Sequence, residues 1–290
     1  MLIPLQEKDL DKYIDFAYEL ALDPARTFYP VFFDGIKTKE NFIARARKAF
    51  SKPEDEILLY QADGAVEGWL HYYHLPEDHY IQLYTSCIRQ NTTGALEELS
   101  GYLAERYPGC DWFVGFPAEN REAEAWAKGA GFRQFDDAQN YSFFFDRYDP
   151  GPDDPSVERI TEENFEKFQR VHRTIEADMF WNCQRVREKL SDWTIFVAEE
   201  DGVAGEIIAK EIIASGSGGS TYEIFAMCCE DGQHHEDLYR RLLTRFLNEG
   251  KRQSAKDLTF FVGTDDEMNR IMPELGFHHV GRYLGYHKVI

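Results

Sequence analysis

The chain has 290 residues, of which 43% are hydrophobic and 15% aromatic, so two domains of ordinary size can each bury a core. Its formal net charge of −20 argues against a nucleic-acid partner, because phosphates are bound by Lys and Arg. The five cysteines include no C-x-x-C pair, no apolar run approaches a membrane span, and the N-terminus becomes charged too early for a signal peptide. We therefore expect a cytoplasmic protein with reduced thiols that binds neither a membrane nor nucleic acid.

The first half of the chain alternates helical and strand patterns. Apolar residues at helical spacing predict a helix that Asp9 caps and a second helix over about 38–50. Asp63-Gly64 is a turn pair between two β-rich runs, so residues 56–75 are expected to form a hairpin. The next elements are predicted as a strand over 80–88, a helix over 92–106, a strand over 111–115, a helix from Asn120 to just before Gly131-Phe132, and a strand over 139–146.

The second half repeats this order after a proline-rich segment. Residues 147–159, RYDPGPDDPSVER, hold three prolines and can continue neither a helix nor a central strand. Beyond them follow a helix from Thr161, a hairpin that turns at Asp201-Gly202, a strand over 220–229, a helix over 238–247, a strand over 258–263 and a second Gly-Phe pair at Gly276-Phe277. The repeat predicts an α/β fold with mixed sheets in two domains, residues 1–148 and 158–290, joined by a linker at 149–157. The Gly-rich run at 215–220 is expected to connect two strands rather than to hold phosphate.

The order of elements over Tyr80–Phe132 resembles the acetyl-CoA-binding core of the GNAT (GCN5-related N-acetyltransferase) superfamily, here in tandem. In that family a splayed strand holds the pantetheine arm, and a Q/R-x-x-G-x-G/A loop cradles the pyrophosphate at a helix N-terminus. Gln90, Thr93 and Ala95 stand at the loop positions, with Thr93 in place of the first Gly, and Asn120 stands eleven residues before Gly131. The resemblance implies that acetyl-CoA, as co-substrate, contacts Thr85, Ser86, Cys87, Ile88, Gln90, Asn91, Thr92, Thr93, Gly94, Ala95 and Asn120.

The second copy departs further from the family pattern. Its loop after the strand reads EDGQHHED, and carboxylates there disfavour a pyrophosphate by like charge. Ala127 and Met272 stand where the family often has a Tyr that acts as general acid. We therefore expect the first copy to bind acetyl-CoA and the second to serve as a structural or substrate-recognition domain.

The resemblance implies acyl transfer from acetyl-CoA to an amine of a small molecule or peptide, with backbone N–H groups of the splayed strand at the carbonyl oxygen. Three routes for the proton of the amine stay open: water, Glu67 on the first hairpin, or Glu223 in the second copy with Tyr286 as acid. The rival hypothesis is a non-catalytic GNAT-fold module that binds a ligand or a partner. The His pairs at 71 and 74 and at 278 and 279 should point to opposite faces of their strands, so no metal site is expected. The acceptor and the oligomeric state stay open.

Overall fold

The computed structural model describes residues 1–29, 38–213 and 220–290, and most of the Gly-rich run at 215–220 lies outside this range. Contacts divide the chain into two compact units. Unit 1 comprises Met1–Asn140 with Val280–Ile290, and unit 2 comprises Tyr141–His279. Within the described ranges, no helix is long and apolar enough to cross a membrane.

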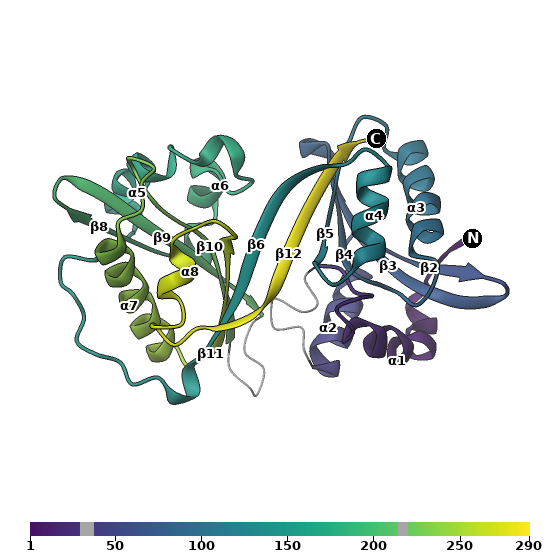
Figure 1. Cartoon of the computed structure of the whole chain (residues 1–290), viewed down its shortest axis with the longest axis horizontal. Coiled ribbons are helices and arrows are strands. Elements are labelled where there is room, and N and C mark those ends of the chain that lie inside the picture. Colours follow the sequence, from purple (N-terminus) through teal and green to yellow (C-terminus); the bar gives the residue numbers. More distant parts are fainter. Residues whose placement is uncertain (30–37, 214–219) are drawn as a thin grey trace. The chain divides into compact units, whose positions relative to one another are not determined.

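Unit 1 contains a mixed sheet and four α-helices among its described residues (Figure 1). Its strands are β1 (Leu2–Pro4), β2 (Asp55–Ala62), β3 (Ala65–Leu75), β4 (Tyr80–Ile88) and β5 (Asp111–Pro117), with parts of β6 (Arg133–Phe144) and β12 (His278–Val289). Its helices are α1 (Leu10–Ala21), α2 (Lys39–Ala49), α3 (Thr92–Arg106) and α4 (Arg121–Gly129). The sheet order is β1-β2-β3-β4-β5-β12, and β4 pairs with β5 in parallel.

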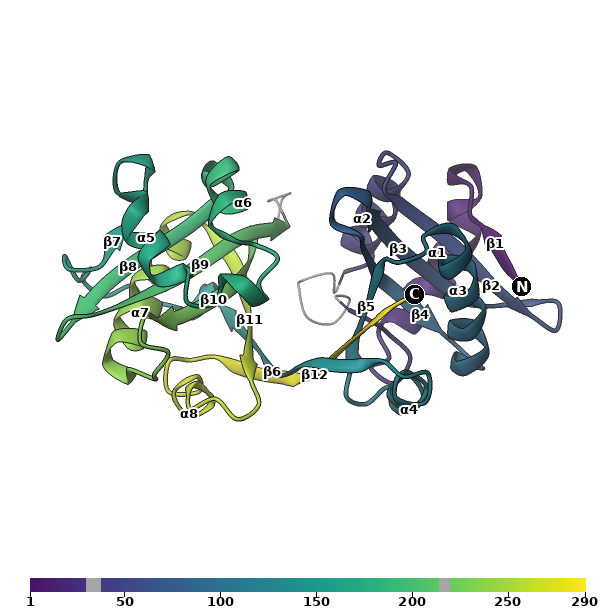
Figure 2. The ribbon, with the colours of Figure 1, turned by 90° about the horizontal axis from the view of Figure 1, so that it is seen from above.

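Unit 2 repeats this plan, as its part of Figure 2 shows. Its strands are β7 (Glu158–Arg159), β8 (Trp193–Glu200), β9 (Val203–Ile213), β10 (Ser220–Cys229) and β11 (Ala255–Gly263). Its helices are α5 (Phe165–His172), α6 (Cys183–Glu188), α7 (Glu236–Arg252) and α8 (Met268–Ile271). The order is β11-β10-β9-β8-β7, and β10 pairs with β11 in parallel. The predicted mixed α/β fold with a repeated topology is therefore confirmed.

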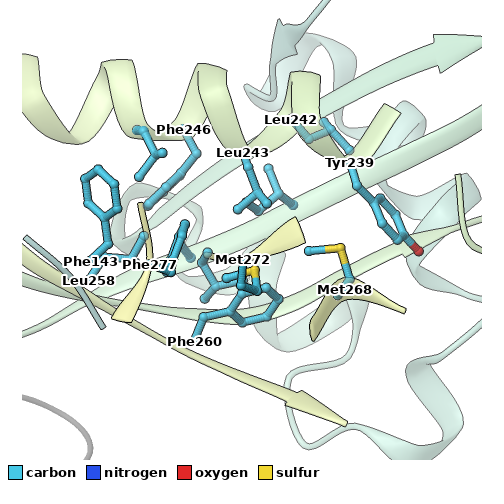
Figure 3. Packing of buried hydrophobic residues seen from close by; sticks show 14 of the residues in the cluster. Phe143, Tyr239, Leu242, Leu243, Phe246, Leu258, Phe260, Met268, Met272 and Phe277 are labelled. Carbon is cyan, nitrogen blue, oxygen red and sulfur yellow. The ribbon is translucent and has the colours of Figure 1, made fainter. Parts of the chain in front are cut away.

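Alternation along the strands explains how unit 2 buries both faces of its sheet. Phe196 and Ala198 of β8 pack into the cluster beneath α7 and α8, whereas Ile195 and Val197 pack beneath α5 and α6. Figure 3 shows the first cluster, in which side chains of α7 meet those of β11 together with Met268 and Met272. In unit 1 the core lies between the sheet and the neighbouring helices α3 and α4.

The last strand, from Val280 onward, belongs to unit 1. β12 runs antiparallel to β5 from Tyr283↔Pro117 to Val289↔Asp111. Leu284 and Tyr286 enter the unit 1 core. The expected second domain, 158–290, thus differs from unit 2, because backbone pairing and apolar burial tie residues 280–290 to β5.

The proline-rich segment at 149–157 groups with unit 2 and is bonded to α7. Asp153 accepts from Arg252 at 2.9 Å, Asp154 accepts from Arg241 at 2.7 Å, and the amide of Asn248 donates to the Gly151 carbonyl at 3.1 Å. These bonds fix the course of a segment whose sequence forms no regular element.

Candidate active site

Strands β4 and β5 part after a short parallel stretch. Their pairing runs from Tyr80↔Asp111 to Gln82↔Phe113, although β4 continues to Ile88 and β5 to Pro117. A bulge in the β3–β4 pairing lies just beyond, and Thr85 in it has a φ of 45°. The resulting gap is the place where the resemblance puts the pantetheine arm, and strands β4 and β5 diverge there.

The gap between β4 and β5 holds a segment of the chain itself, Arg26–Tyr29. The N–H of Thr85 donates to the Tyr29 carbonyl at 2.8 Å, and the N–H of Ile88 donates to the Arg26 carbonyl at 3.0 Å. The N–H of Phe28 donates to Ser86 at 2.9 Å, and the N–H of Tyr29 reaches across to the Gly115 carbonyl of β5 at 2.7 Å. The backbone groups that would hold an extended ligand are therefore bonded within the protein.

Asn120 binds the same segment. Its side-chain amide donates to the Thr27 carbonyl at 3.1 Å, while its side-chain oxygen accepts from the N–H of Ala123 at 3.2 Å and caps α4. Thr27, Phe28 and Asn120 are all buried. The structure thus brings Thr85–Ile88 and Asn120 together, as the resemblance implies, but around residues 26–29.

A backbone N–H group at the start of α3 is also hydrogen-bonded within the protein. Asn91 has a φ of 55°, and its side-chain oxygen accepts from the N–H of Gly94 at 3.2 Å. A Cβ at Gly94 would lie 2.4 Å from the Asn91 amide nitrogen, which explains why this position has no side chain. Of the other predicted loop residues, Gln90 and Thr93 are exposed, whereas Thr92 and Ala95 are buried.

A buried polar chain supports the bulge at Thr85. The Thr85 hydroxyl lies 2.6 Å from His71 Nδ1, and His71 Nε2 lies 2.7 Å from Asp55 Oδ1. Because a carboxylate only accepts, Nε2 carries the proton, and Nδ1 accepts from the Thr85 hydroxyl. Burial lowers the pKa of His71, so the ring is neutral at neutral pH.

Unit 2 has a corresponding gap between β10 and β11, and the strand residues beside it are less buried than those in unit 1. The β10–β11 pairing runs from Ser220↔Ala255 to Ile224↔Phe260, whereas β10 continues to Cys229. Phe225–Cys228 are half-buried, whereas Thr85–Ile88 in unit 1 are buried. The described backbone–backbone bonds of residues 225–229 run to β9 and to the turn at Gly232. Among the described residues, the pairing of β10 with β11 thus ends at Ile224, and β10 continues beyond it along β9.

Three carboxylates of the acidic loop that follows β10 have bonded partners. Glu230 pairs with Arg170 at 2.9 Å, Asp231 accepts from the N–H of Gln233 at 3.0 Å, and Glu236 pairs with Arg240 at 2.8 Å. His235, the N-cap residue of α7, makes no side-chain capping bond. The first turn of α7 thus has no side-chain cap at His235, whereas Asn91 caps the first turn of α3.

The three candidate catalytic residues occupy separate places. Glu223 lies on β10 just before the gap and is 6% exposed. Glu67 lies on β3 of unit 1, with Oε2 3.9 Å from Arg89 Nη1. Tyr286 lies in the unit 1 core, where its ring stacks on Phe116 and burial raises the pKa of its hydroxyl. Tyr286 and Glu223 therefore belong to different units, contrary to their expected place in one copy, because β12 pairs with β5.

Ala127 and Met272, at the family position of a Tyr acid, are both buried in their cores. Burial also raises the pKa of the Cys87 and Cys228 thiols, which keeps them protonated at neutral pH. Among the residues that the structure describes, no group of three or more His, Cys, Asp or Glu side chains could hold a metal ion.

Sequence reasoning missed two polar pairs and the segment in the first gap. His71 with Asp55, and His172 with Glu206 at 2.6 Å, are buried partners whose residues lie far apart in sequence. A buried His at a strand or helix position is the only signal that the sequence offers for them. Residues 26–29, ARTFYP in context, carry no periodic pattern.

No family model matches the chain, and no curated protein matches it. Several solved structures, in contrast, are similar to it. A GCN5-related N-acetyltransferase from Sphaerobacter thermophilus aligns with a TM-score of 0.62 at 12% identity and covers 99% of this chain and 95% of that one. A tandem GNAT protein from the clavulanic acid biosynthesis pathway aligns with a TM-score of 0.62 at 14% identity, over 99% and 98%. A putative acetyltransferase from Pyrococcus horikoshii gives 0.56 at 10%, over 100% and 89%. The chain therefore has the tandem GNAT fold.

Proposed function

We propose that the protein is an acyl-CoA-dependent N-acyltransferase that transfers an acetyl group to an amine of a small molecule or peptide, with the acyl-CoA held in unit 2. The observation that carries this proposal is the gap between β10 and β11, which begins at Ile224↔Phe260 and leaves Phe225–Cys228 half-buried. A splayed parallel pair of this kind presents backbone N–H and C=O groups along which an extended arm can pair.

In this reaction the main task of the protein is to hold the amine beside the thioester carbonyl. The amine nitrogen attacks the thioester carbonyl carbon, the carbon–sulfur bond breaks, and the CoA sulfur receives one proton for the one that the nitrogen loses. Backbone N–H groups of β10 beyond Ile224 would stabilise the charge on the carbonyl oxygen. Glu223, at the start of the gap, is placed to take the amine proton, with water as the other route.

Binding in unit 1 is disfavoured by the structure of its gap. A ligand there must displace Arg26–Tyr29, whose four backbone bonds to β4 and β5 contribute roughly 2–6 kcal/mol at 0.5–1.5 each. The buried Phe28 ring would also become exposed. Unit 1 is therefore the structural partner in this proposal, which reverses the roles that the sequence assigns to the two copies.

The second candidate function is a non-catalytic GNAT-fold protein. The filled gap of unit 1 and the buried Ala127 and Met272 favour it, because both copies then lack part of the family's machinery. The two candidates differ in whether acetyl-CoA binds and whether its thiol is released when an amine is added.

Calorimetric titration with acetyl-CoA tests the proposal through one substitution made in each unit. Gly263→Asp places a carboxylate beside the unit 2 gap, where a Cβ meets no atom nearer than 3.9 Å, so the fold should tolerate it. Gly94→Asp places the same charge at the start of α3, where only the Asn91 side chain must move. We expect one site per chain, an affinity at least about tenfold weaker in Gly263→Asp because of charge repulsion, and native affinity in Gly94→Asp.

The other outcomes decide between the alternatives. Loss of binding in Gly94→Asp alone would return the site to unit 1. No binding to the native protein would favour the non-catalytic candidate. Release of the CoA thiol on addition of amines would distinguish an enzyme from a protein that only binds acetyl-CoA.

A further inference from the structure

A row of side chains crosses the unit 2 sheet just before the gap. Trp193 of β8 lies opposite Lys210 of β9, Lys210 lies opposite Glu223 of β10, and Glu223 lies opposite Thr259 of β11. Directly opposite residues in neighbouring strands present their side chains on the same face, with Cβ atoms about 4.5–5.5 Å apart in antiparallel pairs. The cation Lys210 and the buried carboxylate Glu223 are thus neighbours just before the point where β10 and β11 part.

Lys210 is held in place by aromatic rings. Its Nζ lies 5.0 Å from the ring centroid of Trp181 and 5.1 Å from that of Trp193. Phe225, the first residue of β10 in the gap, packs on Trp193 with the ring centroids 5.3 Å apart. The Lys210 side chain is 23% exposed, and its ammonium lies 3.4 Å from a carboxylate oxygen of the exposed Asp192. Cation–π contacts and one surface ion pair therefore fix the position of this charge while leaving it accessible.

We propose that the acceptor of the acyl group is an amino acid with a large apolar side chain, an inference that rests on the proposed function. Lys210 would bind its carboxylate, Glu223 would face its amine, and Trp181 and Phe225 would contact its side chain. A chain of net charge −20 repels anions at long range, so an anionic group on the acceptor requires a local cation of this kind. Lys210 then determines specificity, whereas Glu223 acts at the reacting nitrogen.

Lys210 also has a purely structural explanation, as the cation that stabilises the rings of Trp181 and Trp193. The two explanations differ in what removal of the charge does. A structural lysine, when replaced, lowers the melting temperature and weakens all ligands alike. A specificity residue changes the preference between ligands that differ only in the carboxylate.

Calorimetric titration of the full chain with three probes separates these cases without using acetyl-CoA. L-Phenylalanine carries both charges, 2-phenylethylamine lacks the carboxylate, and 3-phenylpropionate lacks the amine. We expect phenylalanine to bind at least about tenfold more tightly than either of the others, since a charge-assisted hydrogen bond contributes roughly ten- to a hundredfold. Lys210→Met, which keeps the apolar stem, should reduce phenylalanine to the affinity of 2-phenylethylamine and leave the latter unchanged. Lys210→Arg should restore the preference, and Asp192→Asn, the control, should keep it.

Equal affinity for phenylalanine and 2-phenylethylamine, an equal loss for both in Lys210→Met, or no binding of any probe would overturn the inference. Failure of the proposed function has a different signature. In that case phenylalanine binds in a Lys210-dependent way, but acetyl-CoA does not bind and no CoA thiol is released.

Discussion

At the scale of single residues, the chain from Asp55 through His71 to Thr85 shows how buried polar groups shape the backbone. Thr85 has a φ of 45°, which is costly for a β-branched residue. Its hydroxyl is fixed by His71, which Asp55 holds in turn, and its N–H points to the Tyr29 carbonyl. Three strands thus cooperate to maintain the bulge at which the segment 26–29 is bound.

The neutral state of His71 predicts a pH dependence. Because burial lowers its pKa in the folded protein, the unfolded chain takes up a proton below about pH 6.5 that the folded chain excludes. Stability of unit 1 should therefore fall as the pH drops through this range, by up to about 1.4 kcal/mol per pH unit for this one group. His71→Gln, which bonds but does not titrate, should lose this part of the dependence. Hydrogen exchange of the β3 and β4 amides at pH 7.5 and 5.5 measures it, and identical pH dependence in the two proteins would count against a neutral, buried His71.

At the scale of elements, Arg26–Tyr29 acts as a short additional strand between β4 and β5. It bonds to β4 through three backbone hydrogen bonds and to β5 through one, and Asn120 fixes its Thr27 carbonyl. The same positions in the GNAT resemblance are assigned to a ligand. Unit 1 therefore keeps the splayed strands of the fold while its own backbone satisfies them.

The pairing of β12 with β5 predicts what the removal of this strand does. Seven residue pairs join it to β5, and Leu284 and Tyr286 complete the core of unit 1. Deletion of residues 280–290 should therefore unfold unit 1, since the loss of one buried Leu alone costs about 2–5 kcal/mol. Hydrogen exchange should show loss of protection in β3 and β4 and persistence in β8 and β9. Loss of protection in unit 2 instead would mean that β12 stabilises the half in which its sequence lies.

At the scale of the whole molecule, the two structural units differ from the two halves of the sequence, because residues 280–290 belong to unit 1. The repeat in the sequence correctly predicts two copies of one topology, because it depends on local signals. Asp63-Gly64 and Asp201-Gly202 do form the hairpin turns, with φ values of 50° to 83°. Which copy the last strand joins is not a local property, since it depends on pairing between residues far apart in sequence, such as Tyr286 and Val114.

The candidate site was predictable to a similar extent. The resemblance groups Thr85–Ile88 with Asn120 as contacts of one ligand, and the structure brings both to residues 26–29. The sequence cannot show that residues 26–29 fill the gap between β4 and β5, because backbone hydrogen bonds can form with almost any residue type. It likewise cannot show that Lys210 and Glu223 lie opposite each other, because register depends on the length and shape of the connection between β9 and β10.

We propose that acetyl-CoA binds beside β10 in unit 2 while residues 26–29 stay in the gap of unit 1. Amide hydrogen exchange with and without acetyl-CoA tests this most directly, because both gaps are read in one experiment. We expect slower exchange at residues 225–229 and no change at residues 85–88 or 26–29. Protection at 85–88 together with faster exchange at 26–29 would contradict it, because acetyl-CoA would then have displaced the segment from the gap in unit 1.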